Sequence, residues 1–248
     1  MKMQQQHSFT RGTVGFLLSL SLSAPSLGTA GSLSANIGVV SNYMWRGVTQ
    51  TQDGAAVQGG IDYSHESGFS LGAWISNIDW GTDSPNYELD LYGGFEGSIT
   101  DDFSYSLSTI YYAYPDGRDS DFWEIDASGT FRWFTLGISY TVYGENDGGL
   151  YDAGDFYYHA AFDLDELPFD LALNLRAGYY DFRHDSLSIL PGIKTESADY
   201  WHYGASISKD AGQFGTFSLN WDQNNGKSDS LGGYDNEPKF WVGWTKEF

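Results

Sequence analysis

Two pairs of acidic residues have a single position between their members, and this spacing suggests shared chemistry. Glu88 and Asp90 form one pair, and Glu124 and Asp126 form the other. In an extended strand, residues two apart point to the same face, so both carboxylates of a pair would lie together. Such a group could hold a cation, or it could form ion pairs with Arg46. We favour ion pairing, because buried carboxylates without a partner would take up protons.

Two histidines offer a second kind of chemistry. His159 and His202 fall in segments with the same alternation, with Ser206 and Asp163 as possible neighbours. A nucleophile beside such a base can be activated, as in lipases and acyltransferases of membranes. No nucleophile motif accompanies these residues, and the lack of cysteine excludes thiol catalysis and thiolate metal sites. We therefore expect no enzymatic activity, no cofactor and no metal site.

The segments that carry these residues alternate apolar and polar side chains, as β-strands do. The clearest is FDLALNLRAGYY (169–180), and the segments 87–97 and 133–143 repeat its pattern. No helical periodicity of useful length follows residue 30. Twelve segments of this kind can be counted, at 33–47, 55–65, 68–79, 87–98, 102–114, 121–131, 133–143, 154–164, 168–181, 198–209, 213–223 and 237–248.

The connections between these segments alternate in length. Every second connection is a tight turn, such as 99–101 or the single residue Arg132. The other six are longer and polar, and the longest are 182–197 and 222–236. Short turns on one rim and long loops on the other are typical of a transmembrane β-barrel whose short turns face the periplasm. A β-sandwich gives no reason for such strict alternation.

Residues 1–30 have the features of a signal peptide. Lys2 and Arg11 make the start of the chain basic. The apolar stretch 13–22 (TVGFLLSLSL) follows, and small residues stand at 28–30. The apolar stretch is too short for a membrane-spanning helix. We expect cleavage after Ala30, with Ala35 as the nearest alternative. Residues 31–248 would then form one exported domain.

Charge and aromatic content bear on the class of protein and on its partners. The 33 acidic and 12 basic residues give a net charge of −21, which argues against nucleic acid as a partner. Aromatics are 17% of the chain, and many fall at strand ends, where Trp and Tyr favour the headgroup level of a membrane. The alternative is a soluble all-β domain with an aromatic core. The residues expected in two aromatic girdles are Tyr43, Trp45, Trp80, Tyr111, Tyr114, Trp123, Phe131, Trp133, Tyr179, Trp201, Trp241 and Trp244.

The last segment ends with KFWVGWTKEF. Phe240, Val242, Trp244 and Phe248 share one face of this predicted strand. An outward aromatic face that ends in phenylalanine resembles the C-terminal signal read by the barrel assembly machinery of bacteria. Trp244 and Phe248 are therefore our candidates for an assembly signal. We also expect Phe248 to help close the sheet against the first strand.

Together these features predict an all-β fold, a single transmembrane up-and-down antiparallel barrel of about twelve strands. Strands can cross hydrocarbon only when every backbone group is paired, and a closed barrel achieves this without disulfides. We expect a monomer in the outer membrane of a Gram-negative bacterium. Its surroundings would be outer-membrane lipid and lipopolysaccharide.

The first half of the exported domain is similar to a known family. SNYMWRGVTQT (41–51), VQGGIDY (57–63), SGFSLGAWISN (67–77) and YELDLYGG (87–94) resemble the TorF-type porin family of proteobacterial outer-membrane proteins. The resemblance is strongest over 41–97, and the spacing fits up to the C-terminus. It implies an outer-membrane barrel. It implies no particular solute and no binding residues.

The face expected to point inward is rich in carboxylates, which favour cations in a pore. We expect a porin-like channel for passive diffusion of small hydrophilic solutes, with cations preferred. The alternative is a non-conducting barrel with a structural or surface-binding role, in which the acids pair with Arg46 and Arg176. An outer-membrane lipid-modifying enzyme is a third possibility. The candidate pore-lining residues are Arg46, Asp62, Glu88, Asp90, Glu96, Glu124, Asp126, His159, Asp163, Arg176, His202 and Asp222.

Overall fold

The computed structural model describes residues 31–82, 84–184, 197–226 and 236–248. The predicted signal peptide (1–30) and most of the two longest predicted loops lie outside these ranges. No helix within them is long and apolar enough to cross a membrane.

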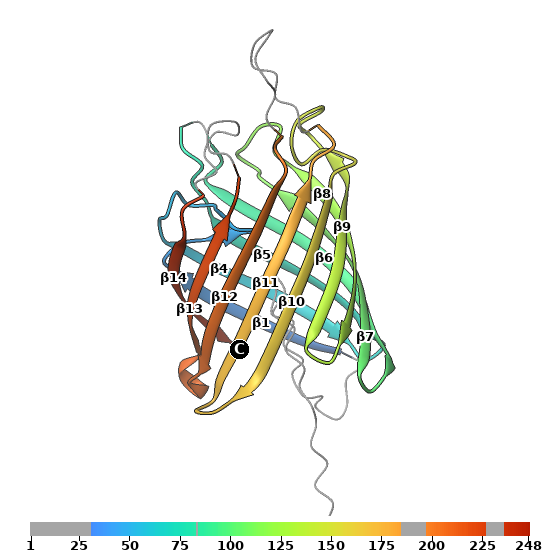
Figure 1. Cartoon of the computed structure of the whole chain (residues 1–248), viewed down its shortest axis with the longest axis vertical. Helices are drawn as coiled ribbons and strands as arrows, with labels where there is room; N and C mark the ends of the chain where they lie inside the picture. The colour runs from blue at the N-terminus through green and yellow to red at the C-terminus, as the bar shows by residue number, and fades with distance from the viewer. Residues whose placement is uncertain (1–30, 83, 185–196, 227–235) are drawn as a thin grey trace, which may run out of the picture.

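Twelve strands form one closed antiparallel barrel, as the alternation predicts (Figure 1). Each strand pairs with its neighbours along the chain, and β1 completes the ring by pairing with β14. The barrel strands are β1 (Gly31–Val40), β4 (Ala56–His65), β5 (Phe69–Asn77), β6 (Tyr87–Thr100), β7 (Phe103–Ala113), β8 (Phe122–Phe131), β9 (Phe134–Gly144), β10 (Phe156–Leu167), β11 (Leu171–Asp181), β12 (Tyr200–Asp210), β13 (Thr216–Asn224) and β14 (Lys239–Glu247). A 3₁₀ turn, η1 (Gly212–Phe214), joins β12 to β13.

The closing seam runs between the two ends of the sequence. β1 and β14 share five Cα pairs, from Asn36–Glu247 to Val40–Gly243. Beyond them, the Phe248 N–H donates to the Ala35 carbonyl at 2.8 Å, and the Ala35 N–H donates to the Phe248 carbonyl at 3.2 Å. The expected contribution of Phe248 to closure is therefore confirmed. Its proposed reading by an assembly machinery stays a prediction.

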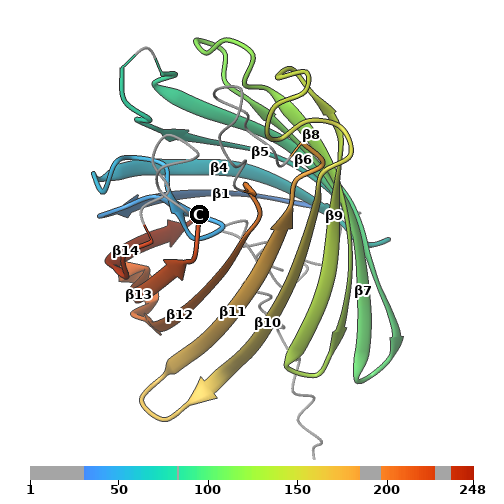
Figure 2. The same ribbon diagram turned by 45° about the horizontal axis from the view of Figure 1, so that its top comes forward.

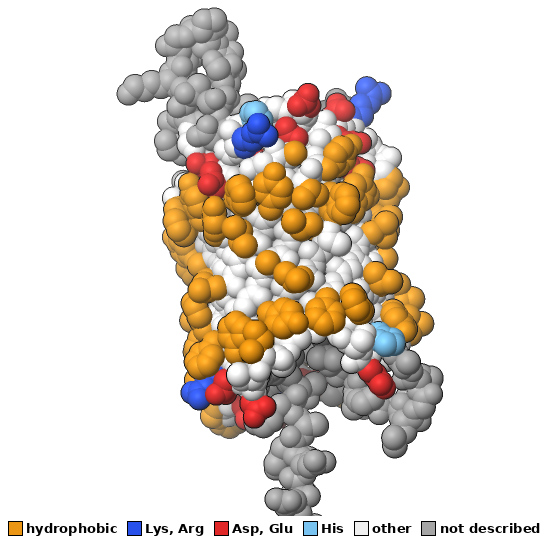
Figure 3. All heavy atoms as spheres, turned by 90° about the vertical axis from the view of Figure 1, so that its right-hand side faces the viewer, with side chains coloured by type: hydrophobic (Ala, Val, Ile, Leu, Met, Phe, Trp, Pro, Cys, Tyr) orange, Lys and Arg blue, Asp and Glu red, His pale blue; other side chains and the backbone are white. Residues whose placement is uncertain are grey.

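The two faces of the wall are reversed relative to a soluble protein. Leu33, Leu71 and Leu219 are 65–70% exposed on the outside. Glu88 and Asp222 are each 2% exposed on the inside. Figure 3 shows apolar side chains gathered in an upper and a lower band on one side of the barrel, with charged side chains at its two ends. An apolar outer band with aromatic borders and a polar interior suit a wall surrounded by lipid.

The connections sort as predicted. The tight turns, such as 66–68 and 101–102, lie at one rim, and the loops after β1, β5, β7, β9, β11 and β13 lie at the other. The long-loop rim is at the top of Figure 1. Both ends of the barrel, at Gly31 and Glu247, are at the short-turn rim, as expected for an even number of strands.

The predicted first strand (33–47) is wrong beyond Val40. There the chain leaves the wall, and segment 41–55 folds into the ring of strands, as the blue trace in Figure 2 shows. It contains a small antiparallel pair, β2 (Met44–Trp45) and β3 (Val48–Thr49), which forms a sheet separate from the barrel. We call residues 44–49 the plug hairpin.

Four of the expected girdle residues are therefore misplaced. Tyr43 and Trp45 are 4% and 7% exposed inside the barrel, because their segment has left the wall. Tyr114 and Trp241 are also buried, at 6% and 8% exposure. The others lie at least partly on the outer surface: Trp80, Tyr111, Trp123, Phe131, Trp133, Tyr179, Trp201 and Trp244.

Candidate functional site: the lumen and its plug hairpin

The interior of the barrel holds a cavity of about 1660 Å³. At one end its lining includes Ser67, Asp102 and Gln213 from the short turns. At the other end it meets Trp45 and Arg46 of the plug hairpin. Among the described residues, the long loops after β5, β7, β9, β11 and β13 contribute nothing to the lining. The cavity therefore reaches the short-turn rim and ends at the plug hairpin.

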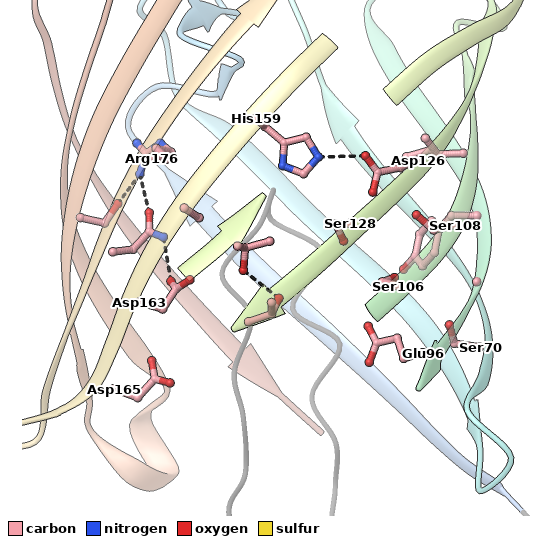
Figure 4. A pocket seen from close by; sticks show the side chains of 18 of the residues that line it. Ser70, Glu96, Ser106, Ser108, Asp126, Ser128, His159, Asp163, Asp165 and Arg176 are labelled. Atoms are coloured by element: carbon pink, nitrogen blue, oxygen red, sulfur yellow. Dashed lines mark hydrogen bonds and ion pairs between the residues drawn. The ribbon is translucent and has the colours of Figure 1, made fainter. Parts of the chain in front are cut away.

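Acidic and hydroxyl side chains dominate this cavity. Its lining includes twelve Asp and Glu residues but only four Arg and Lys residues. In Figure 4, Ser106, Ser108 and Ser128 cover one wall beside Glu96, and Asp163 lies on the opposite wall. Serines and carboxylates offer oxygen atoms to a hydrated cation or a neutral polar solute.

The plug hairpin turns on a two-residue loop. Arg46 and Gly47 have φ of 47° and 77°, and they join Trp45 to its cross-strand partner Val48. Positive φ at both positions is the type I′ hairpin geometry. A Cβ at Gly47 would lie 2.5 Å from the Cβ of His202, so glycine meets both the conformation and the close approach.

A buried ion pair fixes the tip of the hairpin to the wall. Arg46 Nη1 and Nη2 donate to the two oxygens of Glu124 at 2.8 and 2.5 Å. The guanidinium lies 3.9 Å from the Tyr157 ring centre and 5.1 Å from the Tyr180 ring centre. The Tyr180 hydroxyl donates to Glu124 Oε1 at 3.0 Å. The predicted pairing of Arg46 with this acid is therefore confirmed for Glu124.

Further contacts hold the segment from other sides. The Tyr43 hydroxyl donates to Glu88 Oε2 at 3.2 Å, and Asn224 Nδ2 donates to the Gly47 carbonyl at 2.7 Å. The Trp45 ring packs against an aromatic group at the long-loop end, with Tyr112 at 5.8 Å and Tyr151 at 5.5 Å between ring centres. The hairpin is thus tied to strands on several sides of the lumen.

A second buried ion pair belongs to the wall itself. Arg176 on β11 donates from Nε and Nη2 to Asp222 on β13 at 3.1 and 2.6 Å. Its Nη1 donates to Ser206 at 2.7 Å, and the Trp241 indole N–H donates to Asp222 at 2.8 Å. These contacts connect β11, β12, β13 and β14 across the inner face.

The histidines do not assemble with a nucleophile. His159 Nε2 lies 2.9 Å from Asp126 Oδ2, and His202 Nε2 lies 2.7 Å from the Tyr157 hydroxyl (Figure 4 shows the former). Ser206 accepts its hydrogen bond from Arg176 instead. The described residues also contain no group of three or more His, Asp or Glu side chains that could hold a metal ion.

Most of the residues expected to face the lumen reach this cavity. Asp62 and Glu88 are buried but do not line it: Asp62 accepts from Tyr92, and Glu88 accepts from Tyr43. Those that line it are Arg46, Asp90, Glu96, Glu124, Asp126, His159, Asp163, Arg176, His202 and Asp222.

The sequence analysis did not predict the aromatic rings that surround Arg46 or the hairpin turn that places Arg46 in the lumen. Tyr157 and Tyr180 lie on β10 and β11, far from Arg46 in the sequence, and no local pattern connects them. The turn left a signal: Arg46-Gly47 stands between two strand-forming residues, and X-Gly is the common pair of a two-residue hairpin.

Two carboxylates in the long loops have shifted pKa values of opposite sign. Burial raises the pKa of Asp155 to about 6, although this side chain accepts from the backbone N–H groups of Arg183 and Asp152. Hydrogen bonds from Asn86 lower the pKa of Asp116, which is solvent-exposed. The loops after β9 and β11 therefore form a drier part of this rim than the loop after β7.

Comparison with known proteins gives a family and a fold. A family model described as "Bacterial protein of unknown function (Gcw_chp)" matches residues 27–246. No curated protein matches the chain. The KdgM porin structure is similar, with a TM-score of 0.53 and 10% sequence identity over 87% of this chain and 99% of that chain.

Two further structures are similar. KdgM porin in complex with disordered oligogalacturonate gives a TM-score of 0.52 at 7% identity, over 87% of this chain and 98% of that chain. The outer membrane protein OprD from Pseudomonas aeruginosa gives a TM-score of 0.46 at 14% identity and covers 87% of this chain. This chain spans 65% of OprD. At these identities, the likeness to KdgM extends to the fold.

Proposed function

We propose that this chain, which belongs to the Gcw_chp family of bacterial proteins of unknown function, is an outer-membrane channel for passive diffusion of small hydrophilic solutes, with cations preferred. The observation that carries this proposal is the lining of the lumen. Twelve acids against four Arg and Lys residues surround a cavity that reaches the short-turn rim. Carboxylates in a confined aqueous space concentrate cations and repel anions.

The same charge bears on the kind of solute. One of the similar structures is KdgM in complex with oligogalacturonate, which is a polyanion. A lumen with an excess of carboxylates opposes such a ligand. We therefore propose that this barrel passes cationic or neutral solutes, even though it shares a fold with KdgM.

A non-conducting barrel is the second candidate, and a specific observation favours it. The plug hairpin ends the cavity, and its tip is held by a buried ion pair between Arg46 and Glu124. A barrel closed in this way permanently would serve a structural or surface-binding role. In the channel proposal, passage requires the hairpin to shift.

Several finer assignments are part of the proposal. We propose that residues 1–30 are a cleaved signal peptide, that Trp244 and Phe248 are read by the barrel assembly machinery, and that lipopolysaccharide surrounds the long-loop rim. The resemblance of 41–97 to the TorF-type porin family supports the outer-membrane location.

Conductance in planar lipid bilayers tests the channel. The double variant Glu96→Gln/Asp165→Asn removes two lining carboxylates from the short-turn half of the cavity. We expect the cation-to-anion permeability ratio, measured from reversal potentials in a salt gradient, to fall roughly twofold. The control is Asp170→Asn, because Asp170 is 89% exposed and lies outside the lining.

The outcomes separate the two candidates. A ratio that the double variant leaves unchanged would mean that these carboxylates are not on the conducting path. No current steps from the wild-type protein at any voltage would leave the non-conducting barrel as the better account.

A further inference from the structure

The contacts around Arg46 make a binding site for a guanidinium group. Glu124, Tyr157 and Tyr180 come from β8, β10 and β11, and none is more than 3% exposed. Glu124 accepts two hydrogen bonds from the guanidinium, and the Tyr157 ring lies 3.9 Å from its carbon. The Tyr180 hydroxyl orients the carboxylate at 3.0 Å.

This combination selects a guanidinium over other cations. A planar fork of N–H donors matches the two oxygens of a carboxylate, which an ammonium cannot do. A flat cation also stacks on an aromatic ring. The site therefore recognises the shape of the group and not only its charge.

The guanidinium that fills the site belongs to a segment in the lumen that is not part of the barrel sheet. Arg46 is at the tip of the plug hairpin, whose two short strands form a sheet separate from the barrel. By contrast, Arg176 is part of β11, so its backbone is fixed in the sheet together with its partner on β13. Arg46 leaves its site if segment 41–55 shifts, whereas the backbone of Arg176 stays in the wall beside Asp222.

The guanidinium site also lies at the inner end of the cavity. Arg46, Glu124 and Tyr157 line the cavity that reaches the short-turn rim. The acidic lining attracts a cation into the cavity, and the site lies where the plug hairpin ends it. A solute that entered from this rim would meet Glu124 and Tyr157 as soon as Arg46 moved.

We propose that Glu124, Tyr157 and Tyr180 form a binding site for the guanidinium group of a solute, and that Arg46 occupies this site as a tethered competitor when the lumen is closed. The proposal deepens the channel function and rests on it for its biological role. A solute with a guanidinium group would compete with Arg46 and favour the displaced hairpin. The binding site itself can be tested without any measurement of current.

Isothermal titration of the detergent-solubilised barrel with methylguanidinium chloride is the direct test. We expect Arg46→Ala to bind about one equivalent, and to bind it at least ~10-fold more tightly than the wild type, whose site is filled. Methylammonium chloride at equal ionic strength should bind Arg46→Ala ~10-fold more weakly than methylguanidinium does. Adding Glu124→Gln to Arg46→Ala should abolish binding.

Arg176→Ala is the matched control. It also removes a buried arginine that pairs with a carboxylate through two hydrogen bonds. We expect its binding of methylguanidinium to be at least ~10-fold weaker than that of Arg46→Ala, because no ring stacks on the Arg176 guanidinium among the described residues. Equal binding by the two variants would mean that any vacated arginine position suffices, and would overturn the proposal.

Other results decide the remaining cases. No binding by a folded Arg46→Ala variant, or equal binding of methylammonium and methylguanidinium, overturns the site. If Arg46→Ala does not fold, Arg46→Lys keeps the charge and decides the matter, because methylguanidinium must then bind it more tightly than it binds the wild type. Binding without current in bilayers would support the site and reject the channel. Current without binding would do the reverse.

Discussion

The two ends of the lumen use the same charged groups in opposite ways. At the short-turn end, Arg132 and Asp102 are 3.2 Å apart and each is 50% exposed. At the plug end, Arg46 and Glu124 are 2.5 Å apart and 3% and 2% exposed. The first pair is solvated and bounds an open cavity, while the second is enclosed by aromatic rings and ends it. Loss of one partner should therefore matter much more for the buried pair than for the exposed pair.

The largest expected difference between the two ends is in stability. Glu124→Gln leaves Arg46 buried beside a neutral partner, and we expect the free energy of unfolding to fall by ~3–5 kcal/mol. Asp102→Asn removes one partner of the exposed pair and should change the same quantity by only ~0–1 kcal/mol. Urea unfolding of the vesicle-embedded barrel, followed by tryptophan fluorescence, measures both. Similar losses of unfolding free energy from the two variants would show that water reaches the Arg46–Glu124 pair.

Glycines at the two ends provide a second comparison. Gly47 and Gly212 both have positive φ, but a Cβ at Gly47 would lie 2.5 Å from His202, whereas a Cβ at Gly212 would meet nothing within 4 Å. We expect Gly212→Ala to lower the free energy of unfolding by about 1 kcal/mol from the backbone alone. Gly47→Ala should lower it by about 1 kcal/mol more, because the added methyl pushes on the wall. Equal losses would mean that the hairpin moves freely.

The long-loop rim offers a test by pH. The pKa of Asp155 is raised by burial from 3.8 to about 6. The folded state therefore holds its proton more strongly than the unfolded state. Its contribution to stability is fully present below about pH 4 and is lost as pH rises through about 6.

The size of this pH effect should be modest. We expect a loss of about 1–2 kcal/mol in the free energy of unfolding across that window. Asp155→Asn should flatten the curve between pH 4 and 6 in urea unfolding. Asp116→Asn is the control at the same rim, because the pKa of Asp116 is shifted in the other direction. If the Asp155→Asn curve keeps the wild-type slope, another group titrates there.

The wall could be predicted from the sequence because its rule is local. Alternate residues such as Leu171, Leu173 and Leu175 fix which side of a strand meets lipid, whatever the rest of the chain does. The pairing of Arg46 with an acid of the two acidic pairs could also be predicted, because basic residues are few and these acids alternate with outward-facing neighbours. Which of the four acids it meets could not be predicted. The turns needed only their length to be assigned to a rim.

The plug hairpin could not be predicted by the same rule. Tyr43 and Trp45 continue the two-residue alternation of β1, so the pattern is the same whether the chain stays in the wall or bends into the lumen. What decides it is distant: Glu124, Tyr157 and Asn224 supply the contacts that make the inward path favourable. Periodicity records the face of a residue, and it does not record the neighbours that a closed ring brings within reach.

The seam between β1 and β14 has five paired positions, whereas β1 and β4 share ten. Its partners come from opposite ends of the chain, so bringing them together costs more loop-closure entropy than any other junction in the ring. The barrel should therefore close at this seam last during assembly, and these two strands should be the first to separate under a force across the barrel. A nascent chain that lacked its final residues would remain an open sheet with two raw edges, prone to join other copies instead of itself.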